Sequence, residues 1–244
     1  MERTQIRTLG PRTAAIWATL RADLVDRAGL TVVDVGGGTG GFAVPLAEAG
    51  HRVTVVDTSP DALAALTRRA AEAGVAERIT AVQGDADQLA DLIADDSADL
   101  VLCHSVLEVV DNPDRAARAL AAALRTGGSA SVVVANRAAA VLSRALSGHL
   151  SAAAEVAADP AGRAGPADKL RRRFDATGAT ALLAAAGLTV EKIHGVRVLA
   201  DLVPGSVADG DPTGLLALEL ALADEPPYRD IATQLHLYCR KAAG

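Results

Sequence analysis

The feature that most constrains this chain is a short apolar strand that runs directly into a glycine-rich loop. Residues 31–35 read Thr-Val-Val-Asp-Val, the next six read Gly-Gly-Gly-Thr-Gly-Gly, and a helical segment that ends at Gly50 follows. Glycines let main-chain amides approach a ligand closely, and the first turn of a helix adds partial positive charge. The segment therefore predicts a ligand site at the end of a buried strand.

The alternation of strand and helix continues along the chain. Ser59 and Pro60 are typical of a helix start, and Gly74 follows the last turn of that helix. Pro113 opens another helix, which we expect Gly127 to close. Strands are predicted at 31–35, 52–56, 79–83, 98–103, 129–135, 188–198 and 231–240, with further helices at 11–28 and 177–186. This order indicates an α/β fold with a parallel sheet.

Between the fifth and sixth strands the pattern weakens, and Ala and Gly dominate a stretch that is broken by two prolines. We interpret this stretch as a cap or lid. The expected organisation is an N-terminal helical segment, a cofactor-binding core, the cap and a C-terminal part that completes the sheet, at 1–28, 29–136, 137–176 and 177–244.

Composition favours a cytoplasmic enzyme. Half of the 244 residues are hydrophobic, yet no run approaches the roughly 20 apolar residues of a membrane helix. The net charge of −6 argues against general nucleic-acid binding, although Lys169 and Arg171–Arg173 form a basic run. That run is either a solvated surface or a set of contacts to an RNA backbone. Cysteines and histidines show no spacing typical of a metal site, so no metal is predicted.

Polar residues follow four predicted strands at the edge that carries the glycine loop. Asp57 ends the second strand, where its carboxylate can accept hydrogen bonds from two ribose hydroxyls. Asp34 can organise the glycine loop and help hold the methionine ammonium of S-adenosylmethionine. Asp85 can accept from an adenine amino group, and His104 stands at the mouth of the sheet, where ligands of such folds bind. These positions favour S-adenosylmethionine over NAD as the cofactor.

With these residues the sequence resembles the class I S-adenosylmethionine-dependent methyltransferases, most strongly over residues 29–136. The matching stretches are Val33–Gly40, Val56-Asp57, Gly84–Ala86 and His104–Glu108. The resemblance implies a Rossmann-like seven-stranded sheet with helices on both faces, an antiparallel last strand and a small cap insertion. The cofactor-binding residues are then expected to be Arg12, Asp34, Gly36, Gly37, Gly38, Gly40, Asp57, Thr58, Asp85, Ala86, His104 and Ser105.

A narrower resemblance, to the bacterial tRNA 5-carboxymethoxyuridine carboxyl methyltransferases, extends over most of the chain. It is carried by residues 36–38, 104–110, 136, 195–198 with 201, 218–220, 225–228 and 235–237. It implies that Arg12 pairs with the cofactor carboxylate. The chain departs from the family at Ala135 and Ala138, where Tyr and His are usual, and its middle segment has few basic residues.

A carboxylate acceptor is already ionised at pH 7, so the enzyme needs to place it rather than deprotonate it. Arg197, Asn136 and His236 are the predicted catalytic residues, because they are polar residues at strand ends or near the cap. Each also has a simpler interpretation. Arg197 could be a surface residue of its strand, Asn136 a turn residue, and His236 a packed residue on one strand face.

The preferred function is methylation of a carboxylate, with a modified wobble uridine of tRNA or a small anionic molecule as the acceptor. The alternatives are a methyltransferase for a specialised metabolite, favoured by a content of only five aromatic residues, and a non-catalytic cofactor-binding interaction module. Gly36, Gly38 and Gly41 also satisfy the GxGxxG pattern of dinucleotide sites, so an NAD dehydrogenase is a further alternative. No membrane partner is predicted, and the oligomeric state is left open.

Overall fold

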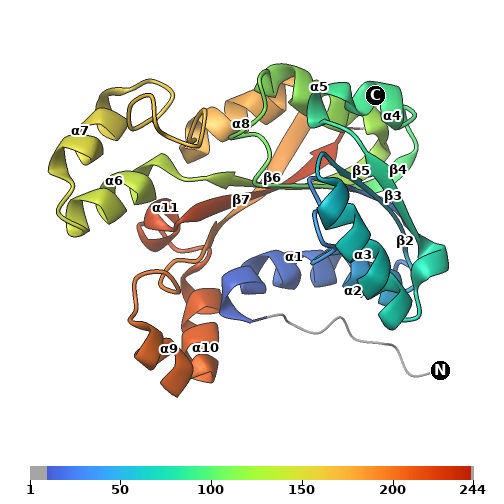
Figure 1. Ribbon diagram of the computed structural model, residues 1–244, viewed down its shortest axis with the longest axis horizontal. Coiled ribbons are helices and arrows are strands. Elements are labelled where there is room, and N and C mark those ends of the chain that lie inside the picture. The colour runs from blue at the N-terminus through green and yellow to red at the C-terminus, as the bar shows by residue number, and fades with distance from the viewer. Residues whose placement is uncertain (1–9, 243–244) are drawn as a thin grey trace.

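A seven-stranded mixed sheet forms the centre of the computed structural model, which describes residues 10–242 (Figure 1). The strand order is β3-β2-β1-β4-β5-β7-β6, and among these strands β7 alone is antiparallel to both neighbours. The bounds are Thr31–Val35 (β1), Arg52–Asp57 (β2), Ile79–Gln83 (β3), Ala98–His104 (β4), Leu124–Ala135 (β5), Leu188–Val196 (β6) and Gln234–Lys241 (β7). The predicted Rossmann-like sheet with an antiparallel last strand is confirmed.

Helices cover both faces of this sheet, as expected. One face carries α1 (Ala14–Leu24), α2 (Ala43–Glu48) and α3 (Pro60–Glu72), and the other carries α4 (Leu89–Leu92), α5 (Pro113–Ala123) and α8 (Ala176–Ala185) (Figure 1). The predicted apolar face of the first helix is buried, at Ile16, Leu20 and Leu24. Side chains alternate along β5, so that Val132 packs in the core beneath α5 and Val133 in the core beneath α1.

The helix α3 begins as the sequence predicts. The side chain of Ser59 accepts a hydrogen bond from the amide of Ala62 over 3.2 Å, and Pro60 occupies the first turn. Such a cap satisfies one of the amides that the first turn leaves without an intrahelical partner.

The predicted end of the next long helix is wrong, because α5 stops at Ala123 and β5 begins at Leu124. Leu124 pairs with Ala98, and the register then shifts before the regular pairing resumes. Gly127 adopts a φ of +74°, and a Cβ on Gly128 would lie only 2.8 Å from a main-chain oxygen of the same strand. The glycines therefore form an irregularity inside the strand rather than a helix stop.

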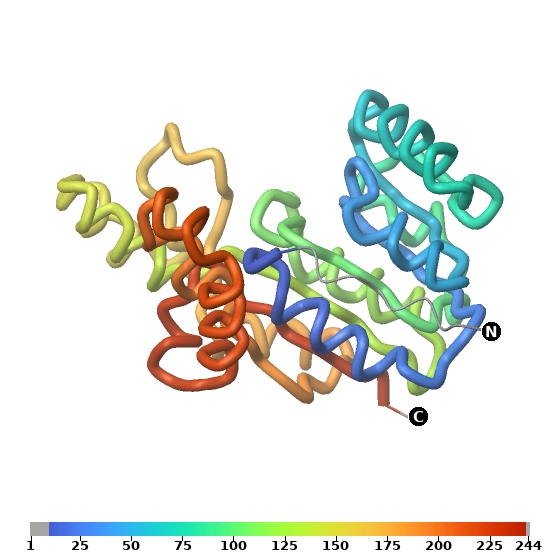
Figure 2. Tube along the Cα trace, turned by 90° about the horizontal axis from the view of Figure 1, so that it is seen from below, coloured from blue at the N-terminus to red at the C-terminus, as the bar shows by residue number. Residues whose placement is uncertain are grey.

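Two helical arms flank the end of the sheet where β5 and β6 finish. The predicted cap, residues 137–176, contains α6 (Arg137–Leu146) and α7 (Leu150–Ala158), and the segment after β6 contains α9 (Gly205–Gly210), α10 (Pro212–Leu222) and α11 (Tyr228–Ile231). Figure 1 shows α6 and α7 on one side of this end and α9 and α10 on the other, and Figure 2 shows the same end from below. The helices between β6 and β7 were not predicted. No helix among residues 10–242 is long and apolar enough to cross a membrane.

Candidate active site

The glycine loop between β1 and α2 is packed so closely that side chains would not fit. A Cβ on Gly36 would lie 2.3 Å from Cγ2 of Val106, and one on Gly40 would lie 2.4 Å from Cδ1 of Leu66. Both glycines also have positive φ, which other residues adopt at a cost. The amide of Gly36 donates to the carbonyl of Val56 over 2.7 Å and fixes the loop against the end of β2. The loop is thus held in one shape by its neighbours.

Asp57 links this loop to the start of α3. Its Oδ2 accepts from the amide of Gly38 over 2.8 Å, and its Oδ1 accepts from the amide of Ser59 over 2.9 Å. Each carboxylate oxygen can accept a second hydrogen bond, so the predicted contact with two ribose hydroxyls fits this geometry.

Asp34 lies beneath the loop with no hydrogen-bond partner for its Oδ2. A Cβ on Gly37 would stand 2.5 Å from this oxygen, so the carboxyl group faces the glycine backbone directly. Burial, and secondarily the negative charge of Asp57, raise the pKa of Asp34 to about 7. A buried acid with a free oxygen is suited to receive a cationic group such as an ammonium.

A pocket of about 310 Å³ opens beside the loop at the carboxyl ends of β1 to β4. Its wall includes many of the predicted cofactor-binding residues, namely Gly36, Asp57, Thr58, Asp85, Ala86, His104 and Ser105. Asp85 also accepts from the amide of Asp87 over 3.0 Å, which starts the short helical turn at Ala86–Gln88. Val106, Val109 and Val110 supply an apolar wall. A polar end and an apolar end fit a nucleoside with a charged tail.

Three polar side chains form a row across β4, β5 and β7, and two of them, Ser131 and His236, are buried. The hydroxyl oxygen of Ser131 lies 2.9 Å from Nε2 of His104 and 2.9 Å from Nε2 of His236. Since the hydroxyl has one hydrogen, it donates to one imidazole and accepts from the other. Burial lowers the pKa of His104 to about 3, and that of His236 well below its usual value, so both rings are neutral.

This row changes the expectation for His236. Its side chain is fully buried and stacks on His194, with 5.3 Å between ring centroids. His104 lines the pocket, and His236 is joined to it through Ser131. The predicted catalytic role of His236 would therefore have to act through Ser131 and His104.

Asn136 caps the helix α6 with its side-chain oxygen and bonds to the end of α11 with its side-chain nitrogen. Its Oδ1 accepts from the amide of Ala138 over 3.0 Å, and its Nδ2 donates to the carbonyls of Asp230 at 2.9 Å and Ala232 at 2.8 Å. Both amide hydrogens are thus engaged. A contact between Asn136 and the methyl acceptor, as predicted, would require one of these bonds to break.

Arg197 follows β6 at the same edge of the sheet. The amide of Thr233 donates to its carbonyl over 3.3 Å, and the next residue, Gln234, donates from its side chain to Oγ of Ser105 over 2.8 Å. Ser105 lines the pocket, so the start of β7 connects Arg197 to the pocket rim. The guanidinium of Arg197 pairs with Asp201.

Arg12 lies in a short turn before α1, and its guanidinium is 3.5 Å from the carboxylate of the same Asp201. The structure thus brings Arg12 and Arg197 together. The predicted contact between Arg12 and the cofactor carboxylate stays a prediction.

Two arginines of the basic run, Arg172 and Arg173, bond to the protein itself. Arg172 donates to the carbonyls of Leu107 at 2.8 Å, Val110 at 2.6 Å and Asp111 at 3.2 Å. Arg173 makes a two-pronged ion pair with Asp168, at 2.6 and 3.0 Å. The two arginines therefore tie the cap to itself and to the pocket wall, since Val110 belongs to that wall. Arg171 pairs on the surface with Asp111 over 3.0 Å.

Glu108 lies under this junction and is 2% exposed. Burial raises its pKa to about 7, although main-chain hydrogen bonds and the charges of Arg172 and Arg173 oppose the shift. Glu108 is thus a buried acid between the pocket wall and the basic run.

Sequence reasoning missed Ser131 and Glu219. Ser131 directly precedes three valines in its strand, and a hydroxyl in so apolar a stretch was a usable signal for a buried polar contact. Glu219 stands among leucines in α10, but its partners are amides at 198–200, which the sequence does not identify. Residues 10–242 contain no group of three or more His, Cys, Asp or Glu side chains that could hold a metal ion.

The fold and this site define a class of protein. Residues 33–132 match the model of a methyltransferase domain family, and the chain is an S-adenosylmethionine-dependent methyltransferase of the class I fold. The cofactor supplies an electrophilic methyl group on a positively charged sulfur. The dehydrogenase and the non-catalytic alternatives are thereby set aside.

Among characterised proteins the chain is similar to the tRNA 5-carboxymethoxyuridine methyltransferase of Escherichia coli strain K12. The two are 28% identical over 239 residues, which cover 94% of this chain and 88% of the relative.

Solved structures share the fold. An S-adenosylmethionine-dependent methyltransferase from Mesorhizobium loti superposes with a TM-score of 0.63 at 23% identity, covering 93% of this chain and 97% of the other. Magnesium protoporphyrin IX methyltransferase from Synechocystis PCC 6803, solved with bound SAH, gives a TM-score of 0.64 at 15% identity. The superposition covers 95% of this chain and 83% of the other.

Proposed function

We propose that this methyltransferase esterifies a carboxylate, and that its acceptor is the carboxymethoxy group of 5-carboxymethoxyuridine in tRNA. The observation that carries the proposal is the reach of the similarity to the E. coli enzyme, which covers 94% of the chain. It therefore extends beyond the methyltransferase domain at 33–132 into the part of the chain that holds the cap and Arg197.

The residues of the site suit a carboxylate. Such an acceptor carries its own lone pair at pH 7, so no base has to remove a proton during the transfer. Burial lowers the pKa of His104 at the pocket wall to about 3, so this imidazole is a weak base, which agrees with a reaction that asks for no general base. What remains is to orient the oxygen and to exclude water. A guanidinium binds a carboxylate in a fixed plane, and Arg197 at the rim is our candidate for this contact.

A small carboxylic acid is the second candidate, and the cap favours it. Arg172 and Arg173 donate to groups of the protein itself, so the basic run offers fewer contacts to an RNA backbone than the sequence indicates. Lys169 and Arg171 are the exposed cations that this run retains.

The test uses S-adenosylmethionine labelled in its methyl group and three kinds of acceptor. These are tRNA that carries 5-carboxymethoxyuridine, the same tRNA without the modification, and the isolated modified nucleoside. We expect label only in the modified tRNA, as a base-labile ester, and a strong loss of kcat/KM in Arg197→Lys because lysine cannot copy the planar contact. Label in the nucleoside with equal efficiency would favour the small-acid alternative, and label in unmodified tRNA would overturn the proposal.

A further inference from the structure

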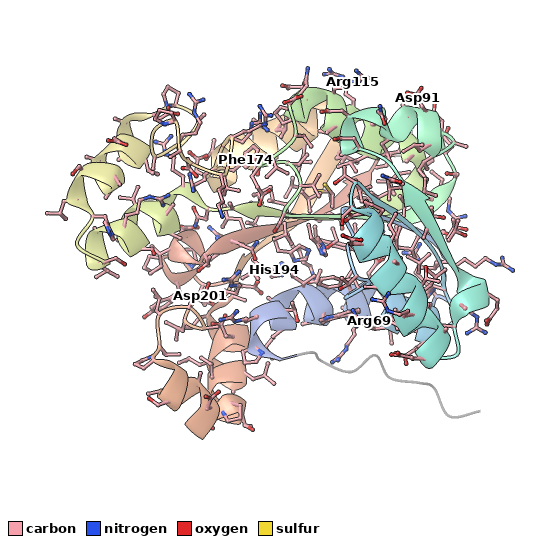
Figure 3. All side chains as sticks on the ribbon, viewed as in Figure 1. Arg69, Asp91, Arg115, Phe174, His194 and Asp201 are labelled. Carbon is pink, nitrogen blue, oxygen red and sulfur yellow. The ribbon has the colours of Figure 1, made fainter. Side chains whose placement is uncertain are left out.

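Two arginines from distant parts of the sequence converge on one aspartate beside the site. Arg12 approaches Oδ1 of Asp201 to 3.5 Å, and Arg197 pairs with Oδ2. The side chain of Asp201 is 20% exposed, that of Arg197 is 29% exposed and that of Arg12 is 69% exposed. Figure 3 shows Asp201 between the start of α1 and the arm that holds α9 and α10. The three groups together carry one net positive charge.

The loop that presents Arg197 and Asp201 is held by a buried carboxylate. Glu219 of α10 is 2% exposed and accepts from the amides of Val198 at 2.9 Å, Leu199 at 2.7 Å and Ala200 at 2.6 Å. Arg197 itself has a φ of +61°, which costs free energy for a residue with a side chain. The strained backbone of Arg197 and the three amides bound to Glu219 show that this loop is held in one conformation. The fold therefore sets the position of Asp201 opposite Arg197.

We propose that Asp201 sets the charge selectivity of the acceptor site. By sharing the guanidinium groups of Arg197 and Arg12, it leaves a charge of +1, which a monoanionic acceptor such as a carboxylate neutralises. A dianion, such as a phosphate monoester at pH 8, would leave an uncompensated negative charge beside Asp201. The side chain thus selects the carboxylate of the proposed acceptor against phosphate monoesters, which carry a second negative charge.

The inference rests on the proposed carboxylate acceptor but can be tested without turnover. Coulomb energies scale with the product of charges, so neutralising Asp201 should help a dianion twice as much, in free energy, as a monoanion. If methoxyacetate then binds about threefold more tightly, methyl phosphate should bind about tenfold more tightly, the square of that factor.

The experiment titrates methoxyacetate and methyl phosphate, at pH 8 and constant ionic strength, into the protein bearing ¹⁵N-labelled arginine. The Nε–H signal of Arg197 is followed, and its absence from the spectrum of Arg197→Gln assigns it. Asp201→Asn should bind methyl phosphate more tightly by about the square of its gain for methoxyacetate. Asp96→Asn is the matched control, because Asp96 also pairs on the surface with a cation, Lys241, and lies at the opposite end of the sheet. Its two affinities should equal those of the unchanged protein.

Equal gains for the two anions in Asp201→Asn, or no gain for either, would overturn the inference. A second variant, Asp201→Ser, guards against an effect of the asparagine amide and should show the same selectivity change. The double variant Arg197→Gln/Asp201→Asn should not show the tighter binding of methyl phosphate that Asp201→Asn shows. Its affinity is measured from the shift in melting temperature that methyl phosphate causes. If instead the proposed function is wrong, the modified tRNA takes up no label, while Asp201→Asn still changes the selectivity between methyl phosphate and methoxyacetate.

Discussion

The main-chain amide of Gly38 donates to Oδ2 of Asp57 over 2.8 Å, so the residue predicted to bind the ribose also holds the glycine loop. The other oxygen of Asp57 accepts from the amide of Ser59 at the start of α3. A single carboxylate therefore joins the end of β2 to two neighbouring turns, and its removal has both a binding and an ordering consequence.

Asp57→Ala should lose the ribose contacts and leave the amide of Gly38 without its partner. We expect the affinity for S-adenosylmethionine to fall by about 1.5–3 kcal/mol, the range for hydrogen bonds to a charged group. Titration calorimetry measures this loss. Asp57→Asn is the control, because its one amide oxygen can replace part of the carboxylate and should give an intermediate affinity. Unchanged affinity in Asp57→Ala would remove this residue from the cofactor site.

Asp34 should make the stability of the protein depend on pH. Its pKa is about 7 in the folded protein and about 3.9 in the unfolded chain, so between these values the folded state binds the extra proton. Stability is then lost as pH rises from about 4 to 7. Asp34→Asn removes this contribution. The difference in free energy of unfolding, Asp34→Asn minus the unchanged protein, should therefore rise by on the order of 2–3 kcal/mol between pH 5 and pH 8.

Urea unfolding at several pH values provides the measurement. Glu108 has a similarly raised pKa and contributes a slope of the same sign, which remains in Asp34→Asn. Glu108→Gln serves as the comparison, since it should remove the other share of the slope. Parallel pH profiles for Asp34→Asn and the unchanged protein would show that Asp34 does not hold its proton at neutral pH.

The core of the site could be predicted because its residues are adjacent to strand ends. Asp34 and Asp57 belong to β-branched strands whose parallel pairing brings their carboxyl ends to one edge. The start of β5 could not be found in the same way. Gly127 resembles a helix stop in sequence, and only its pairing context beside β4 makes it part of an irregular strand.

Contacts between distant segments were the part that the sequence left open. Arg172 and Arg173 read as a basic run because a charge pattern carries no information on which carbonyls lie within reach. The helix α10 had usable signals, since Asp211 caps it and Pro212 occupies its first turn, but its all-round apolar sequence has no amphipathic period. Its burial of Glu219 depends on a loop more than fifteen residues away.

Ser131→Ala should destabilise the protein through two histidines at once. The change leaves Nε2 of His104 and Nε2 of His236 without their shared partner in a buried environment. Each orphaned group costs about 1–3 kcal/mol, so we expect a loss of roughly 2–6 kcal/mol in the free energy of unfolding. Ser97→Ala, which removes an exposed hydroxyl, is the control in the same denaturation assay. A loss no larger than that of the control would mean that the row is not hydrogen-bonded in solution.

The last prediction separates the two roles that the basic run could play. Arg172→Ala removes three hydrogen bonds to the carbonyls at 107, 110 and 111, which hold the apolar wall of the pocket. We expect a loss of about 2–3 kcal/mol in stability and a weaker affinity for S-adenosylmethionine. Arg172→Lys should rescue little, since an ammonium lacks the planar fork that reaches several carbonyls.

Arg171→Ala is the matched variant, because the side chain of Arg171 is 60% exposed and pairs with Asp111, whose side chain is 75% exposed. Its stability should change by less than about 0.5 kcal/mol, since such surface pairs contribute little. If tRNA is the acceptor and Arg171 contacts a phosphate, binding should weaken and the slope of log Kd against log salt should fall by about 0.7–0.9. Filter binding over a range of salt concentrations and denaturation of both variants decide the matter. An unchanged slope in Arg171→Ala would exclude this arginine from an RNA contact, and unchanged cofactor affinity in Arg172→Ala would show that the pocket wall stands without it.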